Sequence, residues 1–532
     1  MSHMNMVKHI SIILAVLLLS LTISHPDLAV AKQNIDPNTS TAELNYRPTY
    51  HFTVPSEWMN DPQRPVYVNG HYNFYYLYNG DYSKNIIGTS YHLAQSNDLV
   101  SFQDKGDAIP KALAPDGKSI WSGSTVVDER NTAGFGKNAV VSIVTALDAT
   151  IPDRPQAQFL YYSTDGGEHF KAYSQQPVFA NPGRTDFRDP KVVWDPESNR
   201  WVMVLAEGNQ LGFYQSKNLV QWEKTGTFSK DHLGVFECPD LFQMKADDGS
   251  IHWILGTGAN GKSIGEPNTY AYWVGNFDGK TFLPINEKEQ WLDQGWDWYA
   301  GVTWENYSKD NDPLTNRYAI GWMNNWDYVN NTVTWEKEGF NGTDSLVRVI
   351  NLKKEGTGYH LYSAPNPNLE AYTKTEKTLP NQSMNGTKEK TRVIGTGVSY
   401  ELSFNLQTKN TNHAGIRFRQ SADGTRFVEL GFDGKEIYLD RSSTPNPDQY
   451  FKRFERTTVL NDQWATKNDQ QVHHVQLFVD KTTVEVFIDN GKYVMSDVIN
   501  SELNDDLITL FSDASTVKLT NLRLSTFNQI QD

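Results

Sequence analysis

Cysteine is almost absent from this chain: its 532 residues include only Cys238. A single thiol excludes any disulfide within the chain, so the fold must be held together by its apolar core. At roughly 100–200 residues per domain, the length suits two or three domains. An excess of basic residues is also lacking. The net charge of −15 disfavours nucleic acid and anionic membrane surfaces as partners, and it is compatible with a neutral substrate.

Long apolar runs are lacking too, apart from one near the N-terminus. Residues 10–23 are apolar except for Ser and Thr, Lys8 supplies a positive flank, and Ala29-Val30-Ala31 has the small-x-small form of a cleavage site. We expect residues 1–31 to be a secretory signal peptide, because the run is too short to span a bilayer comfortably. Residues 32–47 are expected to form a linker. The chain is then secreted, a monomer, and without a stable membrane anchor; an uncleaved anchor is the alternative.

No long amphipathic helix is evident between residues 48 and 360. Short strand-like runs such as "NAVVSIVTAL" and "RWVMVLAEG" alternate with Gly, Asp, Asn and Pro turns. A weak repeat relates "AQSNDLVSFQDKG" to "YQSKNLVQWEKTG", and similar hairpins recur at about 50 to 70 residues. The repeat predicts about five blades of a β-propeller over 48–360. A pair of β-sandwiches with chance similarity is the alternative.

The remainder of the chain changes character. Residues 361–394 are rich in Pro and Asn and are expected to connect two domains. From 395 to 532, strands recur at roughly 10- to 15-residue spacing, which is typical of a β-sandwich, and Asn490-Gly491 suits a hairpin turn. The sequence therefore predicts an all-β chain: a five-bladed β-propeller followed by a C-terminal β-sandwich.

Aromatic residues, in contrast, are abundant, at 12% of the chain, with 15 Trp and 26 Tyr. Their flat faces and polar edges suit grooves that bind sugars, and they equally suit β-rich cores. Composition alone leaves both readings open.

Three acidic residues stand beside features that fix the backbone. Asp61 lies in "WMNDP", Asp189 in "FRDP" and Glu237 in "ECPD", each with Pro one or two residues later. Pro restricts the residue before it and so helps to fix where that side chain points. Such acids on the inner strands of a propeller would meet in its channel, where they could divide the work of glycoside hydrolysis. Each tripeptide is also an ordinary turn, so residue type alone indicates only a possible hydrolase.

These three motifs, in this order and at these separations, resemble glycoside hydrolase family 32, the family of invertases, inulinases and levanases. The resemblance covers nearly all of the chain after the predicted signal peptide, and includes "WSGS", "DQGWDWYAGVTW" and "GWMNNWDY". It implies a retaining mechanism in which Asp61 is the nucleophile, Glu237 the general acid/base and Asp189 the transition-state stabiliser, with the Asp61 and Glu237 carboxyls about 5–5.5 Å apart. No metal or organic cofactor is expected.

The resemblance also implies a set of substrate contacts. Those expected to line the fructose subsite or its mouth are Trp58, Asn60, Gln63, Leu77, Trp121, Ser122, Arg188, Asp297 and Trp326. Packing within the propeller is the alternative role for each of them.

Two departures from the common family pattern bear on the substrate. "WMNDP" continues as Gln63-Arg64-Pro65, and Leu77 stands where many members have Gln. Losing a Gln removes a donor and an acceptor that could close around a terminal fructose, so a pocket could open into a groove. The chain looks closest to the levan-acting branch. We expect β-2,6-fructan hydrolysis within the polymer, releasing short fructo-oligosaccharides.

Three other functions remain open. A levan fructotransferase, which forms a difructose anhydride, would carry the same acids. An exo-enzyme would release free fructose from levan, inulin or sucrose. A non-catalytic levan-binding protein would need no working acids at all. For the C-terminal sandwich, a sugar-binding module and a plain buttress of the propeller are both compatible with the sequence.

Overall fold

The structure is a computed structural model that describes residues 45–307, 312–408, 413–433, 436–445, 456–460, 471–513 and 516–530. The predicted signal peptide, 1–31, and most of the predicted linker, 32–47, lie outside these ranges. Within them, no helix is long and apolar enough to cross a membrane. The one α-helix is α1 (Val333–Glu338), and the 3-10 turns are η1 (Tyr82–Lys84), η2 (Lys111–Leu113), η3 (Asp231–Leu233), η4 (Lys262–Ile264) and η5 (Pro367–Tyr372).

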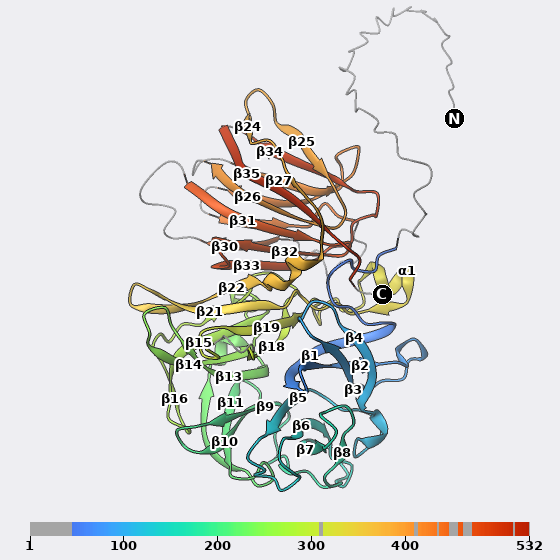
Figure 1. Ribbon diagram of the computed structural model, residues 1–532, viewed down its shortest axis with the longest axis vertical. Helices are drawn as coiled ribbons and strands as arrows, with labels where there is room; N and C mark the ends of the chain where they lie inside the picture. Colours follow the sequence, from blue (N-terminus) through green and yellow to red (C-terminus); the bar gives the residue numbers. More distant parts are fainter. Residues whose placement is uncertain are drawn as a thin grey trace, which may run out of the picture. The chain divides into compact units, whose positions relative to one another are not determined.

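Residues 57–365 form five blades (Figure 1), in which the strands are antiparallel except for β20 (Phe340–Asn341). Blade I holds β20, β1 (Glu57–Val68), β2 (His71–Asn79), β3 (Ser90–Ser96) and β4 (Gln103–Ile109). Blade II holds β5 (Gly123–Asp128), β6 (Ala139–Leu147), β7 (Gln156–Ser163) and β8 (Lys171–Ala172). Blade III holds β9 (Arg188–Asp195), β10 (Arg200–Ala206), β11 (Gln210–Ser216) and β12 (Glu223–Ser229). Blade IV holds β13 (Glu237–Lys245), β14 (Ile251–Gly258), β15 (Tyr270–Phe277), β16 (Phe282–Pro284) and β17 (Gln290–Trp291). Blade V holds β18 (Tyr299–Glu305), β19 (Arg317–Trp322), β21 (Arg348–Glu355) and β22 (Gly358–Pro365).

The burial of each strand follows its place in the blade. The first strands of the blades, β1, β5, β9, β13 and β18, contact one another in a closed ring. The second strand of blade II, β6, reads "AVVSIVTAL" and is buried almost throughout, because apolar residues on both faces of the blade pack into cores. The outer strand β4 reads "QDKGDAI" and is mostly exposed. These observations confirm the predicted five-bladed propeller.

Blade I also joins the two ends of the propeller. β20 pairs in parallel with the start of β1, opposite Glu57 and Trp58. Gly342, which follows β20, lies so close to β1 that a Cβ there would come within 2.1 Å of Met59 Cγ. This close packing of Gly342 on Met59 holds β1, and with it Asp61, against the last blade of the ring.

Residues 373–527 form two packed sheets, which confirms the predicted β-sandwich. One holds β23 (Thr373–Thr378), β24 (Gln382–Asn385), β26 (Tyr400–Thr408), β31 (Gln471–Val479), β32 (Thr483–Ile488), β33 (Tyr493–Val498) and β35 (Thr516–Phe527). The other holds β25 (Thr391–Thr396), β27 (His413–Gln420), β28 (Val428–Asp433), β29 (Glu436–Asp440), β30 (Arg456–Leu460) and β34 (Leu507–Ser512). The predicted Asn490-Gly491 turn joins β32 to β33, with both residues at positive φ.

The structure divides the region between the domains differently from the sequence prediction. Residues 361–394 were expected to be a connection. Instead β22 continues to Pro365 as part of the propeller, and β23 already pairs with β35 of the sandwich. The connection is therefore only the short η5 turn. The difference arises because β23 is a largely exposed strand whose partner is near the C-terminus, so its own sequence is polar.

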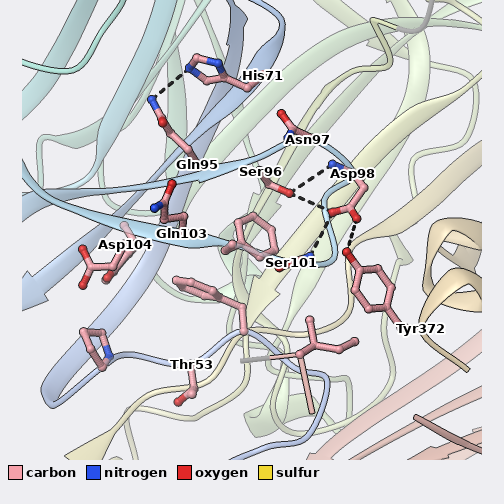
Figure 2. A pocket seen from close by; sticks show the side chains of 15 residues that line it. Thr53, His71, Gln95, Ser96, Asn97, Asp98, Ser101, Gln103, Asp104 and Tyr372 are labelled. Atoms are coloured by element: carbon pink, nitrogen blue, oxygen red, sulfur yellow. Dashed lines mark hydrogen bonds between the residues drawn. The ribbon is translucent and has the colours of Figure 1, made fainter. Parts of the chain in front are cut away.

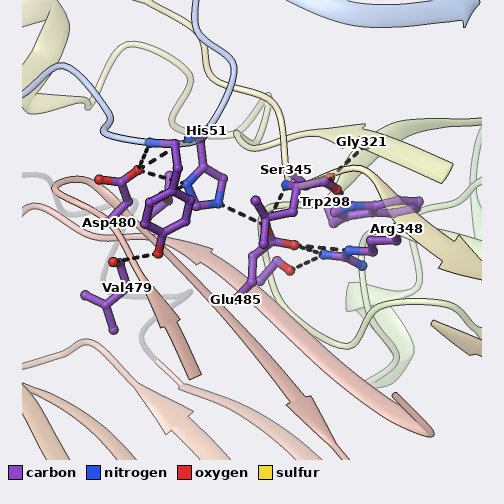
Figure 3. A network of polar contacts seen from close by, with 12 residues as sticks. His51, Trp298, Gly321, Ser345, Arg348, Val479, Asp480 and Glu485 are labelled. Atoms are coloured by element: carbon purple, nitrogen blue, oxygen red, sulfur yellow. Dashed lines mark hydrogen bonds and ion pairs between the residues drawn. The ribbon is translucent and has the colours of Figure 1, made fainter. Parts of the chain in front are cut away.

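A buried polar network links the sandwich to the propeller (Figure 3). His51 lies between the carboxylates of Asp480 and Glu485, at 3.1 and 3.0 Å. Glu485 also pairs with Arg348, whose Nη1 lies 2.8 Å from Asp293 Oδ2. All five side chains are fully shielded from solvent. Buried charges are stable only when paired, so this network fixes how the two sheet systems meet.

Candidate active site

The three predicted acids all lie within the first five residues of inner propeller strands. Asp61 is in β1, Asp189 is the second residue of β9, and Glu237 is the first residue of β13. The strand register shifts at each of these places, as in a β-bulge. Asp189 has φ +59° and Cys238 has φ +45°, both in the left-handed region. A bulge turns a side chain out of the regular alternation, and here it directs the acids into one pocket.

The carboxylate of Asp61 is surrounded by donors. Asn60 Nδ2 donates to its Oδ1 at 3.0 Å, while Ser122 Oγ at 2.5 Å and Cys238 Sγ at 3.5 Å donate to its Oδ2. Trp58 Nε1 in turn donates to Asn60 Oδ1, which fixes the orientation of the amide. These donors engage both oxygens of Asp61 and so fix the orientation of its carboxyl group.

Gln63 occupies a different place from the predicted pocket mouth. Its side chain is only 1% exposed, and its Nε2 donates to the Asp61 carbonyl and to Ser122 Oγ, both at 3.0 Å. Its Oε1 accepts from Tyr91 and from the Gly123 backbone. Gln63 therefore supports the pocket from beneath and does not line it. The register shifts in β1 on either side of Gln63 are the physical reason.

Glu237 and Asp189 meet around one guanidinium group. Arg188 Nη2 lies 3.0 Å from Glu237 Oε1, and its Nε lies 4.0 Å from Asp189 Oδ2. Tyr299 Oη donates to the other oxygen of Glu237 at 2.6 Å. Asp189 Oδ2 also accepts from the Cys238 backbone N–H at 3.0 Å. Both oxygens of Glu237 and one oxygen of Asp189 are thus held in place before any sugar binds.

Crowding of the acids shifts the pKa of Asp189 and of the neighbouring Cys238. Burial, the charge of Glu237 and, to a smaller extent, that of Asp61 raise the pKa of Asp189 to about 7, although Arg188 opposes the shift. Burial and the same acids raise the pKa of the Cys238 thiol well above its usual value, so the thiol stays protonated and donates. Shifted groups in a shared cleft are typical of catalytic sites.

The acids line a pocket of about 410 Å³. Ten of the twelve predicted site residues line it: Trp58, Asn60, Asp61, Leu77, Trp121, Ser122, Arg188, Asp189, Glu237 and Trp326. Trp326 is 48% exposed, and its ring centroid lies 4.9 Å from that of Trp322. A polar floor with aromatic and aliphatic walls suits a sugar ring, which has polar edges and apolar faces.

Asp297 lies outside the pocket. It is fully buried, forms an ion pair with Arg441 of the sandwich, and accepts from Tyr328. Its Oδ2 also accepts from the Val498 backbone at 2.8 Å. The structure thus places Asp297 in the junction between propeller and sandwich and not in the predicted fructose subsite, because both of its oxygens are already used there.

The sequence prediction missed Tyr299. This residue begins β18, the inner strand of the last blade, just as Glu237 begins β13. It lies in "WDWYAG", the segment in which the sequence points instead to Asp297, two residues earlier. The place of Tyr299 in its strand could have identified it, because side chains near the starts of the inner strands converge in this fold.

A larger cavity, of about 730 Å³, lies beside the turn between β3 and β4 (Figure 2). Its polar groups already serve the local fold: Asp98 accepts from Ser96, Tyr372 and the backbone of Ser101. The other acid of its lining, Asp104, is paired with His92. The smaller pocket is therefore the candidate active site. Among the residues described by the structure, no group of three or more His, Cys, Asp or Glu side chains is arranged to hold a metal ion.

Comparison with known proteins identifies the family. Residues 51–365 match the glycosyl hydrolases family 32 N-terminal domain, and residues 368–526 match the family 32 C-terminal domain. A levanbiose-producing levanase of Bacillus subtilis is 47% identical over 508 residues, covering 95% of this chain and 96% of the relative. A levanbiose-producing levanase of Geobacillus stearothermophilus is 51% identical over 391 residues, covering 73% of this chain and 97% of the relative.

Solved structures agree on the fold. The exo-inulinase of Aspergillus awamori has a TM-score of 0.77 at 27% identity, covering 91% of this chain and 99% of that one. The acid-lined pocket, both domain matches and these relatives lead to one conclusion: the chain belongs to glycosyl hydrolase family 32 and is a glycoside hydrolase that acts on fructans.

Proposed function

We propose that the chain hydrolyses levan with retention of configuration, through a covalent fructosyl-enzyme. The observation that carries this proposal is the convergence of Asp61, Asp189 and Glu237 in one pocket, with Asp61 held by three donors. Asp61 attacks the anomeric carbon while Glu237 gives a proton to the departing glycosidic oxygen. Water, deprotonated by Glu237, then breaks the ester bond and frees Asp61. Asp189 binds fructose hydroxyls and stabilises the charge that develops on the ring.

Levan is favoured over other fructans for two reasons. The relatives from Bacillus subtilis and Geobacillus stearothermophilus are named as levanases that produce levanbiose. Leu77 also places an apolar side chain on the pocket wall, so a terminal fructose gains no amide contact at that point. We therefore propose cleavage within the chain and short fructo-oligosaccharide products. Secretion, by way of the predicted signal peptide, is part of the same proposal.

The acids can be tested directly. Asp61→Asn and Glu237→Gln should each lower kcat on levan by at least about 10³-fold, since each removes a group that takes part in bond breaking. Asp153→Asn, at an exposed loop position, is the matched control and should keep full activity. Levan cleavage that survives both active-site substitutions would contradict the assignment.

Product analysis separates this proposal from its closest rivals. The purified protein is incubated with levan, inulin and sucrose, and the products are resolved by chromatography over time. Reducing β-2,6 oligosaccharides that appear early indicate internal hydrolysis. Free fructose as the first product would indicate an exo-enzyme, and a non-reducing difructose would indicate a fructotransferase; either outcome overturns the finer proposal while keeping the family assignment.

A further inference from the structure

A second pocket lies at the opposite end of the propeller channel from the acids. Its volume is about 530 Å³. All five inner strands contribute to it, but from the ends remote from Asp61, Asp189 and Glu237. We call it the distal pocket; its lining includes Arg64, Tyr67, Arg130, Trp194, Gln243 and Tyr307. None of its lining residues lines the acid pocket.

Side chains that cross the channel separate the two pockets. Arg64 Nη1 donates to the Thr125 carbonyl at 3.1 Å, and Lys191 Nζ lies 2.8 Å from Asp240 Oδ1. Lys191 also donates to the Thr303 carbonyl at 3.0 Å. These buried contacts involve all five inner strands, and they lie between the two pockets. A ligand in the distal pocket would therefore be bound independently of the acids.

Exposed aromatic rings mark the distal pocket as a binding surface. Tyr67 and Tyr307 are 39% and 41% exposed, although large apolar side chains are usually covered. Their rings are stacked, with centroids 5.8 Å apart and an interplanar angle of 14°. Beside them, the guanidinium of Arg130 lies 4.4 Å from the centroid of Trp194. Clustered exposed rings in a concave surface are characteristic of ligand sites.

The polar groups of the pocket indicate a neutral ligand. Arg64 is 7% exposed, and its Nε–H has no hydrogen-bond acceptor within the described chain. Its Nη2 pairs with Glu305 at 2.7 Å, and Glu305 also pairs with Arg317 at 3.1 Å. Three arginines and two glutamates line the pocket, so its wall carries a net charge of only +1 and attracts ions weakly. Donors and acceptors beside apolar rings match the hydroxyls and the apolar faces of a sugar.

We propose that the distal pocket is a second fructan-binding site, which holds a stretch of the polysaccharide away from the acids. The proposal rests on the proposed function, because the substrate must be a polymer long enough to bind in two places. Two linked contacts raise the effective concentration of the polymer near the active site without any new catalytic group.

Binding is measured by electrophoresis through gels with and without levan, in an Asp61→Asn background so that the polymer survives. Tyr67→Ala with Tyr307→Ala should raise the apparent Kd for levan by about 10-fold, since each ring contributes roughly a 2- to 10-fold effect. Tyr173→Ala is the matched control: that ring is 44% exposed and lies outside both pockets. In the background with Asp61 intact, turnover of a three-fructose β-2,6 oligosaccharide should stay unchanged.

Each other result overturns the proposal. If levan retards the double variant and its parent equally in the gel, the two rings do not bind levan and the distal site does not exist. If the double variant loses levan binding and oligosaccharide turnover to the same extent, the two rings have a structural role. If the parent is a dimer and the double variant is a monomer, the surface is an interface between two copies of the chain. If the double variant does not fold, Tyr307→Ser alone provides the same comparison. If the protein with Asp61 intact neither binds nor cleaves levan, the proposed function is overturned as well. If that protein cleaves levan but the double variant binds levan as well as its parent does, only the distal site is overturned.

Discussion

Tyr299 donates a 2.6 Å hydrogen bond to Oε2 of Glu237, while Arg188 contacts the other oxygen of the same carboxyl at 3.0 Å. The proposed acid/base is therefore held from both sides. Its orientation depends on blade III, which carries Arg188, and on blade V, which carries Tyr299. Proton transfer requires that a carboxyl oxygen reach the glycosidic oxygen, so this positioning is part of the mechanism.

The phenol of Tyr299 can be removed without its ring. We expect Tyr299→Phe to lower kcat on levan by about 10- to 100-fold with little change in KM, because Glu237 loses one of its two fixed contacts. Initial rates over a range of levan concentrations measure both constants. Tyr270→Phe is the control, since the Tyr270 hydroxyl is buried without a partner in the described chain. Equal rates for Tyr299→Phe and the wild type would contradict a role for the phenol.

Asp189 provides a test of stability against pH. Its folded pKa of about 7 is above its usual value of 3.8, so between these pH values the folded chain holds a proton that the unfolded chain has lost. Folding stability attributable to Asp189 therefore falls as pH rises from about 4 to about 7, and then stays level. Asp189→Asn removes this loss. We expect the variant to gain about 2–4 kcal/mol relative to wild type at pH 8, and much less at pH 4.

Thermal unfolding of Asp189→Asn at several pH values tests this expectation, and the variant should be inactive at each of them. Asp153→Asn, an exposed acid, should show no comparable trend. A gain in Tm that is the same at pH 4 and pH 8 would show that burial of the charge is not the cause.

Local sequence predicted that the three acids would converge, because each one sits in a short motif that also shapes the backbone. Asp61, Asp189 and Glu237 are each followed by Pro within two residues, and each lies at a bulge. The location of Gln63 could not be predicted in the same way. A bulge reverses which side of the strand the following residues face, and nothing in the alternation of "NDPQRPVYV" reveals where the extra residue lies.

Long-range partners explain the other differences. Asp297 is paired with Arg441, 144 residues away in the other domain, so no local pattern indicates that its carboxylate is occupied. The same holds for β23, whose partner strand β35 is at the other end of the sandwich sequence. Periodicity and turn residues predicted the strands and both folds, whereas contacts between distant strands could be found only in three dimensions.

Asp297 should therefore affect stability and not substrate binding. Asp297→Asn leaves Arg441 buried without its counter-charge, which should lower the free energy of unfolding by about 3–5 kcal/mol. KM for levan should be unchanged. Glu376→Gln breaks an exposed pair with Arg523 and should cost less than about 1 kcal/mol. Denaturant unfolding and levan kinetics on both variants decide the matter; a raised KM with unchanged stability would return Asp297 to the substrate site.

His51 makes the junction between the domains sensitive to alkaline pH (Figure 3). Burial disfavours the imidazolium, yet hydrogen bonds to Asp480 and Glu485 outweigh it and raise the pKa of His51 to about 9. A folded pKa above the usual 6.5 means that the charged ring stabilises the fold fully below pH 6.5, and that this contribution is lost as pH rises through 9. The wild-type protein should lose about 3 kcal/mol from this group between pH 6.5 and pH 9.5.

Replacing the ring should remove that dependence. His51→Gln should be clearly less stable than wild type at pH 6, because Asp480 and Glu485 then lack the cation between them, and the difference should shrink by pH 9.5. Denaturant unfolding at pH 6, 8 and 9.5 follows the difference. His169→Gln, in which the replaced ring is 78% exposed, controls for loss of an imidazole as such. A stability difference that stays constant from pH 6 to pH 9.5 would show that His51 acts through packing alone, and that the charge between the two carboxylates does not hold the sandwich to the propeller.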